Sequence, residues 1–363
     1  MRLLAVTRKY LLEIFREWQL VLMILLLPVV FLFITYFSYP GALIQTYPIH
    51  FQALPEETSQ SLETLNNLKA AQYANGLPIY AVDQSLLSTD EIDTRIQSKE
   101  LVLAISVDTQ SQPPAISILG DPLSPAYYQA VNALQPQWLG NQTPQLLQTS
   151  ITPLYAHGPV SNFEVYAPGM IVFAILLMIM QTSMLITREI KSGTIRRYQL
   201  SGTKSAAIVG GITLAQLCIA FLQFIVIGGI SLMLGFHLQG SLWFALLNAV
   251  LLALASIAQG IITGCFLEND TQAATIGATI AMLQVFLSGA FFEMPSLTLF
   301  HIGIHSFNLF DIFPATYSMQ LFNLTLSYGA GWDVLQYRFI LLSILTLLTF
   351  IAAVIIYQKK RLQ

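Results

Sequence analysis

The sequence has 363 residues, of which 55% are hydrophobic and 10% are charged, and its formal net charge is −3. Soluble domains carry roughly 25% charged residues, so this composition excludes a soluble fold of this length and predicts a chain that crosses a membrane several times. No basic patch with interleaved aromatic residues occurs, so the sequence predicts no nucleic-acid partner.

Residues 1–18 predict a cytoplasmic amphipathic helix that lies in the membrane interface. Arg2, Lys9, Glu13 and Arg16 share one helical face, and apolar residues occupy the opposite face. A simple basic flank to the next segment is the alternative. Residues 19–39 follow as the first span. A cleaved signal peptide is the other interpretation of this region, and the long acidic-containing flank argues against it.

Residues 40–165 predict an extracytoplasmic α+β domain, because they carry eleven acidic and three basic residues and no stretch long enough to span a bilayer. Strands are expected near 49–54, 79–83, 101–107 and 115–119, with helices near 56–75 and 88–99 and from 124 onward. Ser88 and Glu91 have the spacing of a capping box. The domain shows no cluster of metal ligands and no nucleophile motif, so we expect neither a metal site nor catalytic residues.

Residues 166–363 predict transmembrane helices 2–6, at 166–186, 206–236, 242–267, 272–292 and 334–357. Twelve of the sixteen Lys and Arg residues lie before residue 18, between 188 and 204, or after 358. Positive residues near span ends stay in the cytoplasm, which places both termini there. The acidic loop 268–270 is an exception. The expected fold is therefore an α-helical polytopic membrane protein with six transmembrane helices and an inserted α+β extracytoplasmic domain.

Two connections between the spans stand out. Residues 188–205 form a short basic cytoplasmic loop that holds five of the sixteen Lys and Arg residues. Residues 293–333 are too long for a turn and too interrupted by Pro and Gly for a span, which predicts an outer re-entrant hairpin.

The spans offer little chemistry for ion-coupled transport. Arg338 is the one clear ionisable residue in them, and it can extend to the interface. The segment 201–205 resembles the end of a phosphate loop but lacks the required glycines. Polar uncharged residues either line a translocation path or hydrogen-bond helix to helix. These residues are Gln181, Gln216, Gln223, Asn248 and Gln284.

Three motifs together resemble a known family. They are R-E-I-K-S-G-T-I at 188–195, L-S-G-A-F-F at 287–292 with Pro295, and F-P-A-T-Y at 313–317. In this order on a six-span frame they resemble the membrane subunit of ABC-2 type ABC exporters, in the branch with a large extracytoplasmic domain between spans one and two. Glu293-Met294 departs from the family pattern, which often has proline directly after the aromatic residue.

The resemblance implies a permease subunit in the inner membrane that pairs with an identical or related permease chain. It also implies two cytoplasmic ABC ATPase subunits that carry ATP and Mg, with no cofactor on this chain. The loop 188–205 would be the coupling helix, and the outer hairpin would shape the exit. The expected coupling residues are Arg188, Glu189, Lys191, Gly193, Thr194, Arg196 and Arg197. The expected hairpin residues are Phe292, Glu293, Pro295, Phe313, Pro314 and Tyr317.

Aromatic residues in the outer hairpin suit an amphiphilic or lipophilic cargo such as a drug, lipid or lipopeptide, although interfacial anchoring explains them equally well. A periplasmic adaptor stays open as a further partner. The alternative function is a membrane-anchored sensor or assembly protein that displays the extracytoplasmic domain. A membrane enzyme acting on lipid is disfavoured because no cluster of catalytic residues lies in or near the spans.

Overall fold

The computed structural model describes residues 2–38, 45–54, 59–73, 76–98, 100–108, 115–120, 125–134, 162–193, 205–291, 298–302 and 305–362. The chain forms two compact units. The helical unit comprises Met1–Pro40, Phe163–Phe300 and Phe307–Gln363, and the inserted unit comprises Gly41–Asn162 with His301–Ser306.

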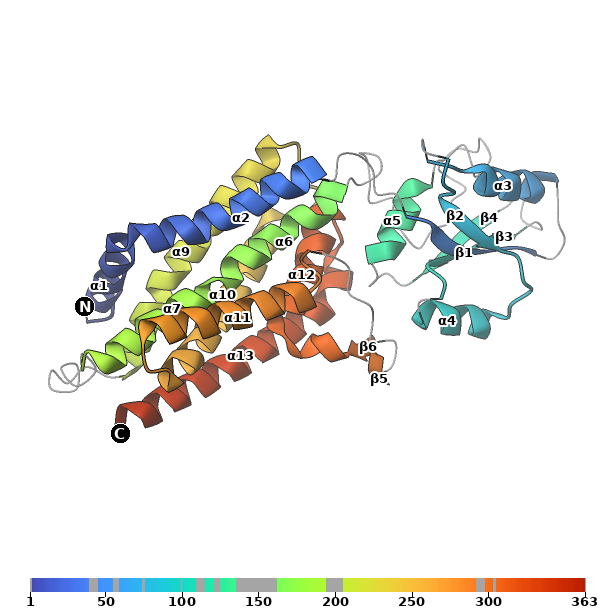
Figure 1. The fold of residues 1–363 in the computed structure, drawn as a ribbon. Coiled ribbons are helices and arrows are strands. Elements are labelled where there is room, and N and C mark those ends of the chain that lie inside the picture. Colours follow the sequence, from blue (N-terminus) through green and yellow to red (C-terminus); the bar gives the residue numbers. More distant parts are fainter. Residues whose placement is uncertain are drawn as a thin grey trace. The chain divides into compact units, whose positions relative to one another are not determined.

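The helical unit is a bundle of long helices. Its main helices are α1 (Arg2–Arg16), α2 (Trp18–Ser38), α6 (Asn162–Leu176), α7 (Met178–Lys191), α9 (Ser205–Met233), α10 (Leu242–Phe266), α11 (Asp270–Leu287) and α13 (Trp332–Leu362). In Figure 1, α10 runs beside α7, α9 and α13, and the N- and C-termini lie at the same end of the bundle.

Five helices are long and apolar enough to cross a membrane: Trp18–Ser38, Phe163–Lys191, Ala207–Met233, Leu242–Phe266 and Trp332–Lys360. By length and composition they correspond to five of the six predicted spans. The segment predicted as a span over 272–292 corresponds to α11, which is not among these five. Its 18 residues rise about 27 Å, and its first turn carries Asp270 and Gln272, so it is shorter and more polar than the others. It packs along α7 nonetheless.

The second predicted span is the buried centre of the bundle. α6 and α7 join at Leu177 with little interruption, and the apolar part of Phe163–Lys191 is wholly buried. Small residues let neighbouring helices approach α7 closely. A Cβ added to Gly260 of α10 would lie 2.6 Å from Thr182 Cβ, and one added to Gly277 of α11 would lie 2.7 Å from Met180 Cα.

Two hydroxyl groups reinforce this contact. Ser183 Oγ donates to the carbonyl of Gly260 at 3.2 Å, and Thr187 Oγ1 donates to the carbonyl of Gly264 at 3.1 Å. The two bonds lie one helical turn apart on both helices. At Gly260 and Gly264 the absence of a side chain leaves the backbone carbonyl of α10 accessible to the hydroxyl groups of α7.

The segment predicted as a re-entrant hairpin contains several short elements. These are β5 (Thr298–Ile302), β6 (His305–Asn308), the 3₁₀ turn η3 (Leu309–Ile312), α12 (Pro314–Phe322) and the π turn η4 (Asn323–Ser327). α12 begins with Pro314 at its first position, where the missing N–H costs no helical bond. Nearly all of α12 and η4 is buried, and α12 packs on α10 and α13.

The inserted unit contains a four-stranded sheet with the order β2-β1-β3-β4. Its elements are β1 (Tyr47–Leu54), α3 (Ser59–Ala70), β2 (Tyr80–Asp83), α4 (Thr89–Gln97), β3 (Leu103–Asp108), β4 (Ala115–Gly120) and α5 (Pro125–Ala133). β1 pairs in parallel with β2 and β3, and β3 pairs antiparallel with β4. The connection from β1 to β2 through α3 and the connection from β2 to β3 through α4 run in opposite directions across the sheet. Right-handed crossovers in opposite directions place their helices on opposite faces of the sheet, as α3 and α4 lie in Figure 1.

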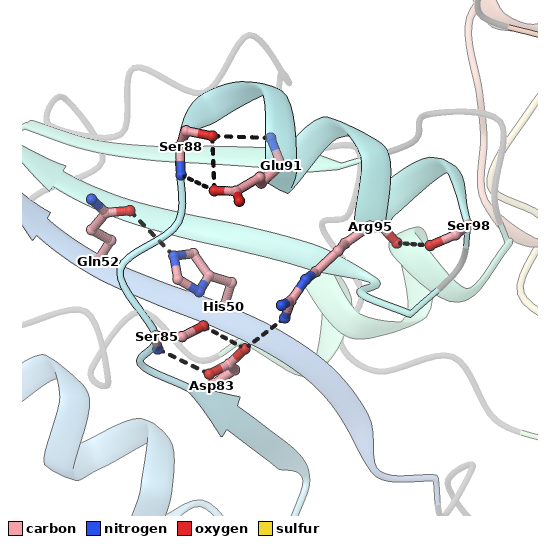
Figure 2. Close-up of polar contacts among 8 residues, drawn as sticks. All are labelled: His50, Gln52, Asp83, Ser85, Ser88, Glu91, Arg95 and Ser98. Atoms are coloured by element: carbon pink, nitrogen blue, oxygen red, sulfur yellow. Dashed lines mark hydrogen bonds and ion pairs between the residues drawn. The ribbon is translucent and has the colours of Figure 1, made fainter.

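The start of α4 carries the predicted capping box. Ser88 Oγ accepts from the backbone N–H of Glu91 at 3.4 Å, and Glu91 Oε2 accepts from the backbone N–H of Ser88 at 2.9 Å. Just before it, Asp83 accepts from the backbone N–H of Ser85 at 2.9 Å and from Arg95 at 3.2 Å (Figure 2). Hydrogen bonds from Ser85 lower the pKa of Asp83, and those from Ser88 lower the pKa of Glu91.

We expect Gly264→Leu to lower the thermal unfolding midpoint of the detergent-solubilised chain, because an added Cβ would lie 2.6 Å from the Ser183 carbonyl oxygen. Overpacking of this kind costs about 1–3 kcal/mol. The matched control is Gly228→Ala in α9, where an added Cβ meets no atom within 4 Å. Equal midpoints for the two variants would contradict the close packing of α7 and α10.

We expect the inserted unit to lose stability below about pH 4. Because the folded-state pKa values of Asp83 and Glu91 are depressed, their stabilisation is present above their ordinary pKa values. It is lost as the pH falls through the depressed values. The measurement is hydrogen exchange of the α4 amides, corrected for the pH dependence of intrinsic exchange. In the double variant Asp83→Asn/Glu91→Gln, amide protection should fall less steeply with acid than in the wild type. Asp93→Asn, which removes another exposed charge of α4, is the control and should keep the wild-type profile.

Candidate functional site

Charged side chains join α1, α7 and α11 at one end of the helical unit. Lys9 Nζ of α1 donates to Glu189 Oε1 of α7. The neighbouring Arg188 bonds to Glu17, which lies between α1 and α2, and to Asp270 at the start of α11. We call these five residues the ion-pair junction. They connect three segments that lie far apart in the sequence.

The burial of the junction is uneven. The side chain of Glu189 is 3% exposed, whereas that of Lys9 is 38% exposed. A buried carboxylate is costly unless it is paired and hydrogen-bonded, so Glu189 depends on Lys9. Arg188 and its two partners are 30–44% exposed, so their pairing is screened more by solvent. Removing Lys9 should therefore disturb the junction more than removing Asp270.

A small cavity adjoins the junction, lined by Glu13, Glu17, Gln181 and Arg188 among others. Its volume of about 20 Å³ has room for one water molecule. Gln181 Oε1 is buried without a hydrogen-bond partner among the described residues, and the cavity supplies it with one possible site for hydration. The polar part of α7 therefore begins about two turns before the ion pairs.

The predicted coupling residues divide into three groups. Arg188 and Glu189 occupy the last turn of α7, and Glu189 faces α1. Lys191 is exposed, and Gly193 has a φ of 66°, which turns the chain directly after the helix. Thr194, Arg196 and Arg197 lie outside the described residues.

The polar residues predicted in the spans are all buried, and three of them hydrogen-bond between helices. Gln223 donates to the carbonyl of Ala174 at 2.9 Å, and Asn248 donates to the carbonyl of Ser318 at 2.9 Å. Gln284 bonds to Gln259 of α10. These contacts favour the interpretation as links between helices.

Gln216 differs from these three. It is fully buried in α9, and neither atom of its amide has a hydrogen-bond partner among the described residues. It is therefore the strongest remaining candidate for a polar contact along a translocation path.

Arg338, which was noted as able to extend to the interface, is buried between helices. It is 8% exposed, and its Nε donates to Gln320 Oε1 of α12 at 2.6 Å. Pro314 and Tyr317 of the predicted hairpin are buried in α12, and Phe313 is half-buried before it. Phe292, Glu293 and Pro295 lie outside the described residues.

One pair was missed in the sequence. Glu164, at the start of α6, accepts from His237 Nδ1 at 2.8 Å and from the His237 backbone N–H at 3.2 Å. The sequence places Glu164 just before one predicted span and His237 just after another. These positions alone do not identify the two residues as partners, because they are 73 residues apart.

The α4 face of the inserted unit holds a second polar group of residues. Figure 2 shows His50 of β1 between Gln52 and Asp83, and His50 Nε2 lies 3.3 Å from Gln52 Oε1. His50 is 1% exposed and stands opposite Asp83 in the strand register. A shallow pocket of about 610 Å³ lies nearby, lined by Asp83, Arg95 and Glu100 among others.

This group gives no reactive constellation. Asp83 is held as an anion by Ser85 and Arg95, so it is not a proton donor near neutral pH. Among the described residues, no three His, Cys, Asp or Glu side chains are placed to hold a metal ion. The polar contacts instead fix α4 and the loop before it on the sheet.

The comparison with family profiles gives one match. The family described as "ABC-2 family transporter protein" matches residues 18–355, which is nearly the whole chain. A comparison with curated proteins found no match. The matched region contains five helices suited to crossing a membrane and most of the ion-pair junction. Members of this family are membrane components and are not themselves catalytic. The chain therefore belongs to the ABC-2 family of transporter proteins, as a multi-pass membrane permease of an ABC exporter.

Proposed function

We propose that the ion-pair junction transmits the movement of an ABC ATPase to the spans. The observation that carries this proposal is the pairing of the last turn of α7 with both α1 and α11, directly before the basic segment 194–204 in the sequence. Two cytoplasmic ATPase subunits would bind this loop and supply ATP and Mg. A second permease chain, identical or related, would complete the transporter.

The sidedness of this proposal rests on charge. The basic residues near both termini and in the loop after α7 favour the cytoplasm, and the termini share one end of the bundle (Figure 1). The inserted unit would then be extracytoplasmic in the inner membrane. The acidic loop 268–270 fits the same side because Asp270 pairs with Arg188.

The junction suits a mechanical role because its ion pairs connect α7 to two other segments and such pairs can be kept or exchanged. A partner can shift a two-state protein only by binding the two states differently. An ATPase that engages Lys191 and the following loop would pull the last turn of α7. Glu189 would then keep or exchange its contact with Lys9, so that α1 moves with α7 or separates from it.

The proposed cargo is an amphiphilic or lipophilic molecule such as a drug, lipid or lipopeptide. It is supported by the scarcity of charged residues in the spans and by the aromatic residues of the outer segment, including the half-buried Phe313. A periplasmic adaptor would be a further partner of the inserted unit. Gln216 is the residue proposed to contact cargo within the bundle.

We expect charge reversal at the junction to uncouple the transporter. Glu189→Lys should lower cargo-stimulated ATPase activity of the reconstituted complex by at least about tenfold, which equals ~1.4 kcal/mol. Lys9→Glu should act similarly, and the swapped double variant should recover much of the activity because it restores the pair. Arg8→Glu reverses an exposed charge one residue away and is the control.

The decisive comparison is between the single and swapped variants at equal expression and membrane insertion. Full coupled activity in Glu189→Lys would remove Glu189 from the mechanism. Loss without any recovery in the swapped variant would indicate that each residue acts separately on the ATPase.

We expect Phe313→Ala to change the range of exported compounds while leaving basal ATPase activity intact. Phe313 precedes the buried α12 and lies at the segment proposed to shape the exit. The measurement is a resistance profile over compounds of graded lipophilicity, with Phe292→Ala alongside. Ile312→Ala alters the exposed neighbour and is the control. An unchanged profile in both Phe variants would count against an exit role.

A further inference from the structure

An apolar cavity of about 230 Å³ lies within the helical unit. Its walls come from α6, α9, the first turn of α10 and η4, and they include Pro168, Ile171, Phe224 and Leu326. Ser231 supplies the hydroxyl group in the lining, and its Oγ already donates to the carbonyl of Ile227 at 2.8 Å. The cavity therefore offers contact to hydrocarbon and little to a polar ligand.

Two adjacent glycines create much of this space. Gly228 and Gly229 line the cavity on α9, and a Cβ added at either position meets no atom within 4 Å. Glycine elsewhere in the bundle marks close helix contact, as at Gly260 and Gly264. Here the missing side chains leave a void. A void in a packed interior loses dispersion contacts unless something fills it.

The size and position of the cavity identify the filler. Apolar cavities of about 150 Å³ already bind small hydrocarbons such as benzene. Ile225, Leu232 and Leu242 line this cavity and are each about half exposed, so it opens on the outer surface of helices that are suited to crossing a membrane. The medium outside that opening is lipid hydrocarbon.

A polar pair, which we call the polar rim, directly flanks residues of the apolar cavity in the sequence. Glu164 lies one turn before the cavity residues Ala167 and Pro168, and His237 lies between the cavity residues Phe236 and Leu238. His237 Nδ1 is bonded to Glu164, and its side chain is 68% exposed. The Nε2 atom is therefore the group of the ring that can hydrogen-bond to a lipid headgroup.

We propose that this cavity binds an acyl chain of a bilayer phospholipid, with the headgroup against His237. The apolar lining, the lateral opening and the polar rim match the two parts of such a molecule. This inference concerns a resident lipid and stands independently of the cargo and of the ion-pair junction.

The test uses the full chain in nanodiscs of phosphatidylethanolamine and phosphatidylglycerol doped with a phosphatidylethanolamine that carries a diazirine in its acyl chain. After irradiation, peptides covering residues 224–232 and 164–171 should carry the label. Gly228→Leu places a side chain toward the cavity at a position where an added Cβ meets no atom within 4 Å, and it replaces glycine by a better helix former, so it should fold. It should reduce this labelling at least fivefold.

Leu214→Phe enlarges an exposed residue of the same helix outside the cavity and should leave the labelling unchanged. Labelling of the exposed face of α2 serves as the internal standard for both variants. Labelling spread evenly over α2, α9 and α13, or unaffected by Gly228→Leu, would overturn the proposal. A second variant, Ile225→Cys, tests whether another copy of the chain covers the cavity. A disulfide between two copies at this position, together with absent lipid labelling, would also overturn the proposal.

Discussion

The apolar part of the span formed by α6 and α7 is wholly buried, and neighbouring helices approach α7 closely where small residues face it. Lipid chains are as apolar as leucine, and helices in a bilayer therefore associate through close packing and interhelical hydrogen bonds. Gly260, Gly264 and Gly277 provide the packing, and Ser183 and Thr187 provide the bonds. The position of α7 in turn fixes where Arg188 and Glu189 emerge. The geometry of the ion-pair junction is thus a consequence of packing several turns away.

The junction and the apolar cavity differ in how the protein interior is filled. At the junction, burial of Glu189 is tolerated because Lys9 supplies a cation, and the exposed partners around Arg188 remain partly solvated. In the cavity, Gly228 and Gly229 leave space that no protein side chain fills. One region is held by specific pairing and the other is open to its surroundings. A transporter needs both properties, since some contacts must transmit force and others must yield.

Much of the fold follows from local sequence patterns. Hydrophobic length predicted five spans, Ser88 and Glu91 predicted the start of α4, and Pro125 predicted the start of α5. The parallel register of β1 with β2 and β3 was not predictable, because strand pairing depends on distant residues. The partners in the junction were missed for the same reason. The burial of Arg338 against Gln320 was likewise not predictable, because the two residues belong to different helices. The apparent exception at 268–270 has a physical explanation, since Arg188 neutralises Asp270.

The separation of the junction residues in the chain has a consequence for biogenesis. Lys9 and Glu189 are 180 residues apart, and Glu17 and Arg188 are 171 apart. The larger part of the inserted unit, Gly41–Asn162, lies between them. A chain emerging from the ribosome therefore exposes its first span and this part of the inserted unit before α1 gains its partners. Loop closure over such a length is entropically costly, and the charges of α1 stay solvated until then. The junction is consequently a late checkpoint of assembly, reached only when both ends of the inserted unit have returned to one bundle.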